Sequence, residues 1–258
     1  MIRLGRISYV NMAPVFYRVE AEYEEVAGVP TALNAALLAG DCDLAPISSI
    51  EYARHAGRLR ILPRLCVSSQ GAVESIQLVS KAPLERVRRV AVTPESATSV
   101  VLTRVLLPEA EHVPLDVPEA ADADATLLVG DAALRSAFED PTPHYDLGRL
   151  WLERTGLPMV FAVWACPEPL HAGLAELEEA LVASVRLARA EPEQLAHEAS
   201  DRYGYPAGFL ARYFEKLRYS FGPRERAGLL TFLELARDAG ELDHVPELRF
   251  VHEEPVPA

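Results

Sequence analysis

The chain has 258 residues, of which 50% are hydrophobic and 24% charged, and its formal net charge is −13. This composition predicts an ordinary globular protein with one large core or two modest ones, and the acidic excess argues against nucleic-acid binding, which needs a basic face. No segment has the length of a membrane span or the apolar run of a secretory signal, so we expect a cytoplasmic protein without membrane contact.

Three cysteines, Cys42, Cys66 and Cys166, are far apart in the sequence and have no histidine at metal-ligand spacing. This pattern favours small buried apolar residues over a disulfide framework or a zinc site. We therefore expect no metal ion, and no motif in the sequence implies a cofactor.

The first predicted elements are a strand over 2–10 and a helix over 30–39. The helix ends at Gly40, the residue type favoured at a helix C-terminus. The apolar segment that follows runs into Pro46, and Ser48 stands where a serine hydroxyl caps the next helix.

The order of strand, loop and helix then recurs. Residues 87–92 predict a strand, 93–99 a polar loop and 99–107 a helix, and a buried strand over 125–129 precedes a further helix. Strands that alternate with helices indicate an α/β fold with mostly parallel sheets, in which ligands bind at the carboxyl ends of strands.

From about residue 172 onward the sequence predicts amphipathic helices alone. No flexible linker interrupts the chain, so any two lobes must be joined by ordered segments. The best candidates for these crossings lie near 78–84 and 158–166.

Asn11 interrupts the first strand within the sequence ISYVNMAP. Asparagine favours turns by bonding its own backbone, and Pro14 cannot continue a β-ladder, so a turn explains the residue without a ligand. The alternative is that the strand end presents the Asn11 amide to a ligand. The residues alone leave both interpretations open.

The sequence ESATS places three hydroxyls, those of Ser96, Thr98 and Ser99, directly before a predicted helix. One hydroxyl suffices to cap a helix, and capping alone explains part of this pattern. The remaining hydroxyls and the free N–H groups of the helix predict a site for a small anion such as a carboxylate.

Further candidate contacts stand at predicted strand ends and turns: Gly71, Ser75, Gly130, Asp131, Pro158, Met159 and Phe161. Glycine lets the backbone approach a ligand closely, whereas a turn and a helix cap explain Asp131 equally well. The sequence has no Ser-His-Asp arrangement, phosphate-binding loop, GxGxxG or HExxH, so an enzyme built on these residues uses no obvious strong acid or base.

Six segments together resemble the chorismate dehydratase family of the futalosine route to menaquinone, in the order and spacing expected of that family. They cover about the first two thirds of the chain, and the last is specific: SYVNMAP, LLAGDCDLAPISSIEY, GAVESIQLVSK, ESATSVVL, ATLLVGDAAL and DLGRLWLERTGLPMVFAVW. The helical tail carries no such signature.

The resemblance implies a two-lobed α/β fold similar to type II periplasmic binding proteins, with a helical C-terminal tail. Lobe one would comprise residues 1–80 plus 166–258, and lobe two residues 81–165.

The implied reaction is the loss of water from chorismate to give 3-[(1-carboxyvinyl)oxy]benzoate, with chorismate as the small-molecule partner and no cofactor. The resemblance places Asn11 in the cleft as a catalytic residue and, in the same way, Ser75. The remaining candidates, Ser48 among them, would bind the substrate.

Two other classes share the implied fold: a non-catalytic small-anion binding protein or sensor, and the sister enzyme 1,4-dihydroxy-6-naphthoate synthase. The sister family has an initial loop rich in Cys, Pro, Asn and Asp, which this sequence lacks. A sensor would need a DNA-binding module, for which we expect no room before the first strand.

Overall fold

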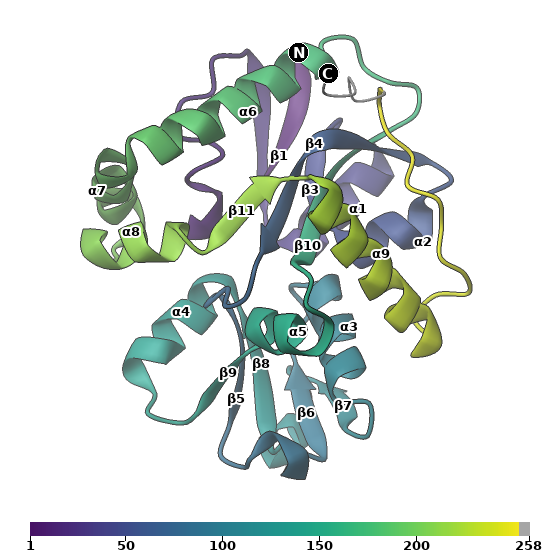
Figure 1. The fold of residues 1–258 in the computed structure, drawn as a ribbon, viewed down its shortest axis with the longest axis vertical. Helices are drawn as coiled ribbons and strands as arrows, with labels where there is room; N and C mark the ends of the chain where they lie inside the picture. Colours follow the sequence, from purple (N-terminus) through teal and green to yellow (C-terminus); the bar gives the residue numbers. More distant parts are fainter. Residues whose placement is uncertain (253–258) are drawn as a thin grey trace.

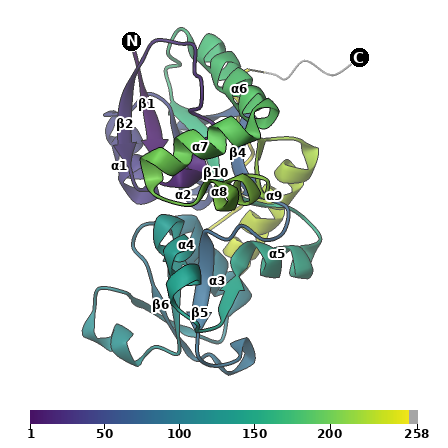
Figure 2. The same cartoon turned by 90° about the vertical axis from the view of Figure 1, so that its left-hand side faces the viewer.

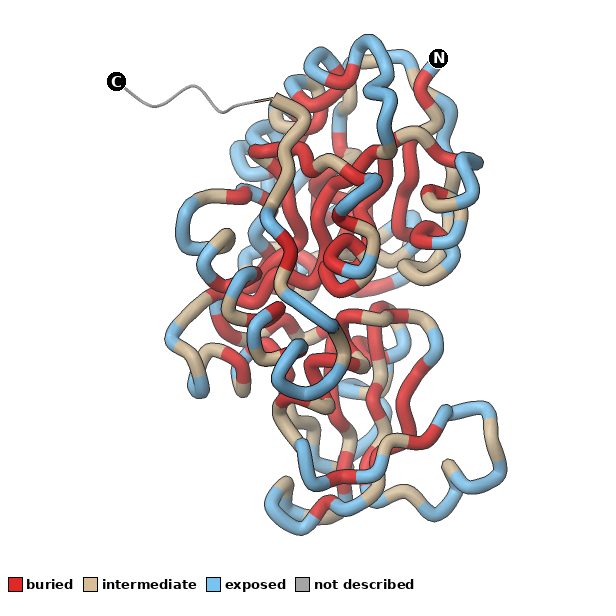
Figure 3. The backbone as a smooth tube through the Cα atoms, turned by 90° about the vertical axis from the view of Figure 1, so that its right-hand side faces the viewer, coloured by how far each residue is buried: buried red, intermediate tan, exposed pale blue. Residues whose placement is uncertain are grey.

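Two separate groups of β-strands form the cores of two lobes, one above the other in Figure 1. The computed structural model describes residues 1–252. Buried residues concentrate on the strands of both lobes and on the helix faces turned toward them (Figure 3). The predicted two-lobed α/β fold with a helical C-terminal tail is confirmed. The expectation of helices alone after residue 172 is wrong at residues 217–220, which form a strand and pair with residues of the upper sheet.

In the upper lobe, a four-stranded sheet in the order β11-β4-β10-β3 lies beside the parallel pair β1 and β2. The strands are β1 (Ile2–Ile7), β2 (Tyr23–Gly28), β3 (Ala45–Ser48), β4 (Leu59–Ser69), β10 (Met159–Pro167) and β11 (Leu217–Ser220). The helices are α1 (Pro30–Ala39), α2 (Ser49–His55), α6 (Leu174–Ala190), α7 (Pro192–Tyr203), α8 (Ala207–Phe214) and α9 (Pro223–Asp238).

The lower lobe holds one five-stranded sheet in the order β7-β6-β8-β5-β9. Its strands are β5 (Ile76–Ser80), β6 (Arg89–Val92), β7 (Glu111–Pro114), β8 (Ala125–Val129) and β9 (His144–Asp146), and its helices are α3 (Ala97–Leu106), α4 (Gly130–Glu139) and α5 (Leu147–Thr155). β6 runs parallel to both neighbours, whereas β5 is antiparallel to both of its own.

The expectation of mostly parallel sheets is wrong for the four-stranded sheet, in which every pairing is antiparallel. The reason lies in the path of the chain. β4 carries it out of the upper lobe and β10 brings it back, so these two neighbours run in opposite directions.

The chain crosses between the lobes at residues 70–75 and 156–158. Residues 76–80 form β5 and pair with β8, so they belong to the lower sheet, and Met159 already begins β10 of the upper sheet. The expected crossings near 78–84 and 158–166 therefore lie too far along the chain. The strands before and after a crossing have the same apolar pattern, so the sequence does not show to which sheet a strand belongs.

We propose lobe boundaries that follow these crossings: residues 1–69 with 159–252 for the upper lobe and 76–155 for the lower. They replace the expected division into 1–80 plus 166–258 and 81–165, which leaves β5 and most of β10 outside the sheets that they pair with.

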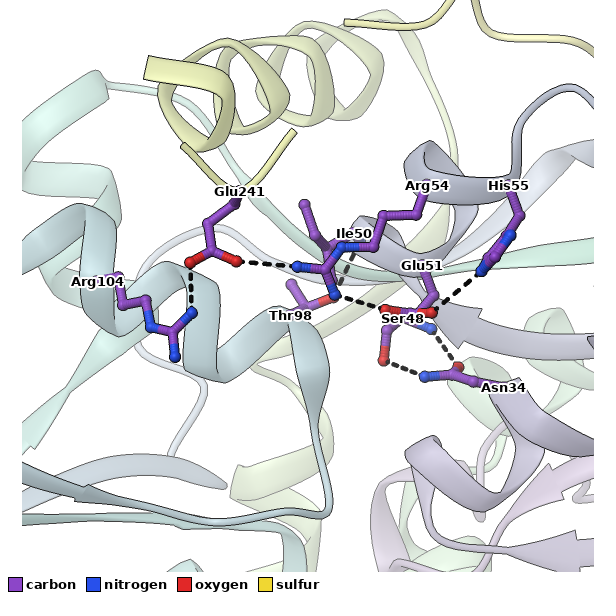
Figure 4. A network of polar contacts seen from close by, with 9 residues as sticks. All are labelled: Asn34, Ser48, Ile50, Glu51, Arg54, His55, Thr98, Arg104 and Glu241. Atoms are coloured by element: carbon purple, nitrogen blue, oxygen red, sulfur yellow. Dashed lines mark hydrogen bonds and ion pairs between the residues drawn. The ribbon is translucent and has the colours of Figure 1, made fainter. Parts of the chain in front are cut away.

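The helical tail contacts both lobes. Helices α7 and α8 lie above α4 of the lower lobe (Figure 2), where Phe209 packs edge to face on Phe138 with ring centroids 4.7 Å apart. Glu241, just after α9, forms ion pairs with Arg104 of α3 and with Arg54 of α2, the latter at 2.9 Å (Figure 4). Within residues 1–252, no helix has the length and apolarity that a membrane crossing needs.

Helix α9 also packs directly on the second crossing. A Cβ atom added at Gly228 would lie 2.1 Å from the carbonyl oxygen of Pro158, so no larger residue fits there without movement of the backbone. The same carbonyl accepts a hydrogen bond from the indole N–H of Trp151 at 3.1 Å. The tail helix and α5 therefore hold this crossing from two sides.

One carboxylate, that of Asp146, holds the first crossing. It caps α5 by accepting from the N–H of Arg149 at 3.0 Å, and it also accepts from the N–H groups of Val73 at 3.0 Å and Glu74 at 2.7 Å. The side-chain amide of Gln77 adds a further bond at 2.9 Å. Glu74 is the one non-glycine residue with positive φ in the described chain, at 59°, and this ring of donors stabilises that unfavourable backbone.

We expect Asp146→Ala to lower the free energy of unfolding by at least about 2 kcal/mol, because loss of a helix cap costs about 0.5–2 kcal/mol and each buried unpaired N–H about 1–3 kcal/mol. Urea unfolding measures the change. Asp140→Ala is the control, since exposed Asp140 accepts one local bond from Thr142, and it should shift stability by about 0.5 kcal/mol or less. Equal effects of the two variants would contradict this role for Asp146.

Candidate functional site

A small cavity of about 50 Å³ lies between the lobes beside the first crossing. The upper lobe contributes Ile7, Tyr9, Asn11, Pro30, Ser48, Val67, Phe161, Ala162 and Leu217, and the crossing and lower lobe contribute Val73, Ser75, Ile76, Ser96, Ser99, Val129 and Gly130. None of these lining residues is Asp, Glu, His, Lys or Arg. The cavity therefore offers hydroxyls, one amide and backbone groups in apolar surroundings.

Most of the residues singled out from the sequence meet in this cavity. Those that line it are Asn11, Ser48, Ser75, Ser96, Ser99, Gly130 and Phe161. Five others do not line it: Gly71, Thr98, Asp131, Pro158 and Met159. Segments that are far apart in the sequence thus contribute polar groups to one cavity.

Asn11 lies in a 3-10 turn, η1 (Val10–Met12), rather than at the strand end itself, because β1 stops at Ile7. The turn is closed by bonds from Met12 N–H to the Tyr9 carbonyl at 3.1 Å and from Ala13 N–H to the Val10 carbonyl at 3.0 Å. The Asn11 Oδ1 atom is buried and has no hydrogen-bond partner within residues 1–252. A buried amide oxygen of this kind is poised to accept a hydrogen bond from a ligand.

The N-terminus of α3 brings Ser96 and Ser99 into the cavity. Ser96 is the N-cap: its Oγ accepts from the N–H of Ser99 at 3.4 Å and lies 2.8 Å from the Ser99 Oγ. Both residues are buried. The first N–H groups of a helix lack internal partners and exert a positive field, so this end of the cavity is suited to a carboxylate.

Thr98 is turned away from the cavity, contrary to its expected role beside the two serines. Its Oγ1 accepts a hydrogen bond from the N–H of Ile50 at 3.4 Å, across the contact between α3 and α2 (Figure 4). Successive residues on a helix point about 100° apart, and for this reason neighbouring hydroxyls in the sequence face different surroundings.

The hydroxyl of Ser48 is held by Asn34 of α1. The Asn34 side chain donates to the Ser48 Oγ at 3.1 Å and accepts from the Ser48 N–H at 3.0 Å (Figure 4). Because the hydroxyl oxygen is already an acceptor in this pair, its own hydrogen is available to a ligand in the cavity.

Ser75 follows the strained Glu74 in the first crossing and faces the same cavity. Its carbonyl accepts from the N–H of Gly130 at 2.7 Å, which ties the crossing to the end of β8. Its hydroxyl donates to the Val73 carbonyl in a long bond of 3.4 Å. This internal bond is weak, and the Ser75 side chain also interacts with the Tyr213 hydroxyl, so a ligand would compete with two protein partners for it.

Tyr9 spans the two lobes at the edge of the cavity. Its hydroxyl donates to Glu95 of the lower lobe at 2.6 Å, and burial together with this bond raises the pKa of Tyr9. Nearby, the N–H of Thr31 donates to the Glu95 carbonyl at 3.2 Å. The Tyr9 ring lies directly on Gly130, where an added Cβ would be 2.6 Å from ring carbons.

Asp131 joins the lobes beside the cavity rather than lining it. Its carboxylate accepts from the N–H of Val10 at 3.2 Å, and its carbonyl accepts from the Tyr205 hydroxyl at 3.1 Å. Burial raises the pKa of Asp131, whereas the bond from Val10 lowers it. Asp131 therefore links the lower lobe to the upper lobe through two contacts.

Gly71, Pro158 and Met159 lie in or next to the two crossings. The Gly71 carbonyl accepts from the Ser69 hydroxyl at 2.8 Å, the Pro158 carbonyl accepts from Trp151, and Met159 is fully buried at the start of β10. All three residues therefore contact other parts of the protein rather than the cavity. A predicted turn does not reveal whether its residues will face a ligand or the protein.

Sequence reasoning did not single out the other lining residues, which are mostly apolar: Ile7, Tyr9, Pro30, Val67, Val73, Ile76, Val129, Ala162 and Leu217. Tyr9 had a signal, because an aromatic residue with a polar end stands two positions before Asn11. Leu217 belongs to β11 in the tail and has no local signal at all. In the described chain, no group of three or more His, Cys, Asp or Glu side chains gathers in a way that would hold a metal ion.

Comparisons with known proteins agree with this geometry. A family model described as menaquinone biosynthesis matches residues 2–238. A protein of Thermus thermophilus named chorismate dehydratase is 36% identical over an alignment of 265 positions. The alignment covers 90% of this chain and 93% of that protein.

Solved structures share the fold at lower identity. A protein of Archaeoglobus fulgidus superposes with a TM-score of 0.78 at 20% identity, covering 93% of this chain and 98% of that one. The periplasmic aliphatic sulphonate binding protein SsuA of Escherichia coli gives a TM-score of 0.64 at 15% identity, covering 100% and 95%. The two-lobed fold is thus that of periplasmic binding proteins.

We expect Gly130→Ala to disfavour the closed arrangement, because its Cβ would meet the Tyr9 ring and because φ at this position is +58°. The matched control is Gly40→Ala, where φ is +81° but nothing lies within 4 Å of the added Cβ. Both variants carry the strain of a left-handed backbone, about 1–2 kcal/mol.

Small-angle X-ray scattering then separates the two effects. Gly130→Ala should increase the radius of gyration by opening the lobes, and Gly40→Ala should leave it unchanged. Identical scattering from the two variants and the parent would show that the Tyr9 contact does not control closure.

Proposed function

Since the chain belongs to the menaquinone biosynthesis family, we propose that it is a chorismate dehydratase, a hydro-lyase that converts chorismate to 3-[(1-carboxyvinyl)oxy]benzoate in the futalosine route. The observation that carries this proposal is the 36% identity to the Thermus thermophilus chorismate dehydratase over 90% of the chain. An enzyme of this biosynthetic kind would act in the cytoplasm.

The proposed reaction fits a cavity without charged side chains. The ring carbon that bears the enolpyruvyl ether loses its hydrogen, the neighbouring carbon loses its hydroxyl, and the two leave as water while the ring gains its third double bond. Aromatisation drives the elimination, so the protein contributes chiefly orientation and fixed dipoles. The loss of water needs no oxidant or reductant, so the reaction requires no cofactor.

The proton acceptor in this proposal is one of the substrate's own carboxylates. None of the residues that line the cavity has a carboxylate, imidazole or amine side chain. A substrate held with its enolpyruvyl carboxylate near the departing hydrogen would supply the base itself, and the enclosure would exclude competing water.

Each polar group of the cavity then has a role in holding a dianion. The N-terminus of α3, with Ser96 and Ser99, would bind one carboxylate, and the free hydrogen of the Ser48 hydroxyl would donate to a second oxygen. Asn11 and Ser75 would flank the leaving hydroxyl. Thr98 is omitted from this set because its hydroxyl bonds Ile50.

The lobes must separate to admit the substrate. The cavity of about 50 Å³ is far below the roughly 300 Å³ at which ligand pockets begin. Opening would break the bonds from Tyr9 and Thr31 to Glu95, and closing would remake them over the bound substrate. We therefore propose that this arrangement is the closed form.

Incubation of the purified full chain with chorismate tests the proposal. Mass spectrometry should show a product lighter than chorismate by one water, with an aromatic absorption spectrum. Tight binding of chorismate without product would favour a non-catalytic small-anion binding protein. Turnover of a different pathway intermediate, with none of chorismate, would favour the sister 1,4-dihydroxy-6-naphthoate synthase.

Asn11→Asp distinguishes the two interpretations of Asn11. Asparagine and aspartate both support turns, so a purely structural Asn11 predicts a folded and active variant. If Asn11 faces the substrate, the change removes an N–H donor and places a negative charge beside a dianion. We expect turnover to fall at least ~100-fold, the typical cost of one aimed donor, with a melting temperature close to that of the parent. Turnover within a few fold of the parent would assign Asn11 to the turn alone.

A further inference from the structure

The carbonyl of Asn11 lacks the backbone partner that its turn would normally supply. In η1 each N–H donates to the carbonyl three residues earlier: Met12 bonds Tyr9, and Ala13 bonds Val10. The next donor in this series would be residue 14, but Pro14 has no N–H. Val15 resumes the series one step later by donating to the Met12 carbonyl at 3.1 Å.

A tyrosine from the tail fills this gap. Tyr219 of β11 is buried, with 3% of its surface exposed, and its hydroxyl donates to the Asn11 carbonyl. Among the backbone bonds of the described turns and loops, none ends at this carbonyl. Burial raises the pKa of Tyr219, so the hydroxyl stays protonated and remains a donor throughout the neutral range.

The other side of the turn is fixed by the lower lobe, since the N–H of Val10 donates to Asp131. The turn that carries Asn11 therefore has one anchor in the lower lobe and one in the tail. The anchor in the tail belongs to the upper lobe, so it persists when the lobes separate. Leu217, two residues before Tyr219, lines the cavity itself, which places this strand directly behind the site.

We propose that Tyr219 is a positioning residue for the reaction: it replaces the N–H that Pro14 lacks and so holds the Asn11 amide toward the cavity. This proposal rests on the proposed function of Asn11 in chorismate dehydration. It also gives the C-terminal tail, which carries no signature of its own in the sequence, a direct part in the site.

The first test removes the hydroxyl alone, by Tyr219→Phe. We expect kcat to fall roughly 10- to 100-fold, since misplacing a group by about 1 Å can cost 10²-fold, and KM to stay within about threefold of the parent. Tyr52→Phe is the matched control. Tyr52 is fully buried in the same lobe and bonds backbone groups of Glu247 and Arg249 away from the cavity, so its loss should lower stability but leave kcat unchanged.

A double-mutant cycle separates positioning from a general structural effect. In an Asn11→Ala background no amide remains to be positioned, so Tyr219→Phe should lower kcat less than about twofold further. A merely structural role predicts the same fold loss of kcat in both backgrounds, and that result would overturn the proposal.

Restoring the missing backbone donor is a second, independent test. Pro14→Ala returns an N–H at the position from which the turn would bond the Asn11 carbonyl. Combined with Tyr219→Phe, it should recover most of the lost kcat, whereas Pro14→Ala in the parent should change kcat little. A combined variant no better than Tyr219→Phe alone would count against the proposal.

A parent protein that does not convert chorismate would remove the proposed function but not decide the role of Tyr219. In that case crystal structures of the parent and of Tyr219→Phe decide it. A displaced Asn11 turn in the variant, with the rest of β11 unmoved, supports positioning by Tyr219. An Asn11 turn that superposes on the parent's overturns it.

Discussion

The path of the first crossing, and with it the position of Ser75 in the cavity, depends on one carboxylate. Asp146 gathers donors from both sides of Glu74 and from the start of α5, which fixes a left-handed residue that would otherwise be unfavourable. The next residue is Ser75, and its carbonyl receives the N–H of Gly130. The position of the Ser75 hydroxyl and its link to the end of β8 thus follow from one half-buried acceptor.

The proposed substrate is a dianion, although the protein is strongly acidic. A net charge of −13 opposes a dianion at long range, but salt screens exposed charges within about 8 Å at physiological ionic strength. In the proposed site the groups nearest to a carboxylate would be the N–H dipoles of α3 and the hydroxyls of Ser96 and Ser99, which are buried and would act strongly in a region of low dielectric. Fixed dipoles also leave no lysine or arginine that would need its own desolvation.

The sequence predicted local features well and long-range ones less well. Hydroxyls before a helix and the break at Asn11 were visible, since capping and turn chemistry depend on adjacent residues. Ser75 was a candidate from its place in the sequence, and only its catalytic role came from the family resemblance. The direction of β4 against β10 was not visible, because apolar patterning is the same in parallel and antiparallel strands. The orientation of Thr98 was not visible either, because its partner Ile50 lies in the other lobe. The contact of Tyr219 with Asn11 could not be predicted, because the two residues are 208 positions apart in the sequence.

One of the two tryptophans of the chain places a natural fluorophore at the second crossing. Trp151 is fully buried in α5 and its indole N–H bonds the Pro158 carbonyl at the second crossing, whereas Trp164 lies in β10 with its ring 6.1 Å from that of Phe16. If the lobes open as proposed, rotation of the lower lobe about this crossing would alter the surroundings of the first indole and leave the second in the core of the upper lobe. Intrinsic emission should therefore follow the angle between the lobes in solution, without any attached dye.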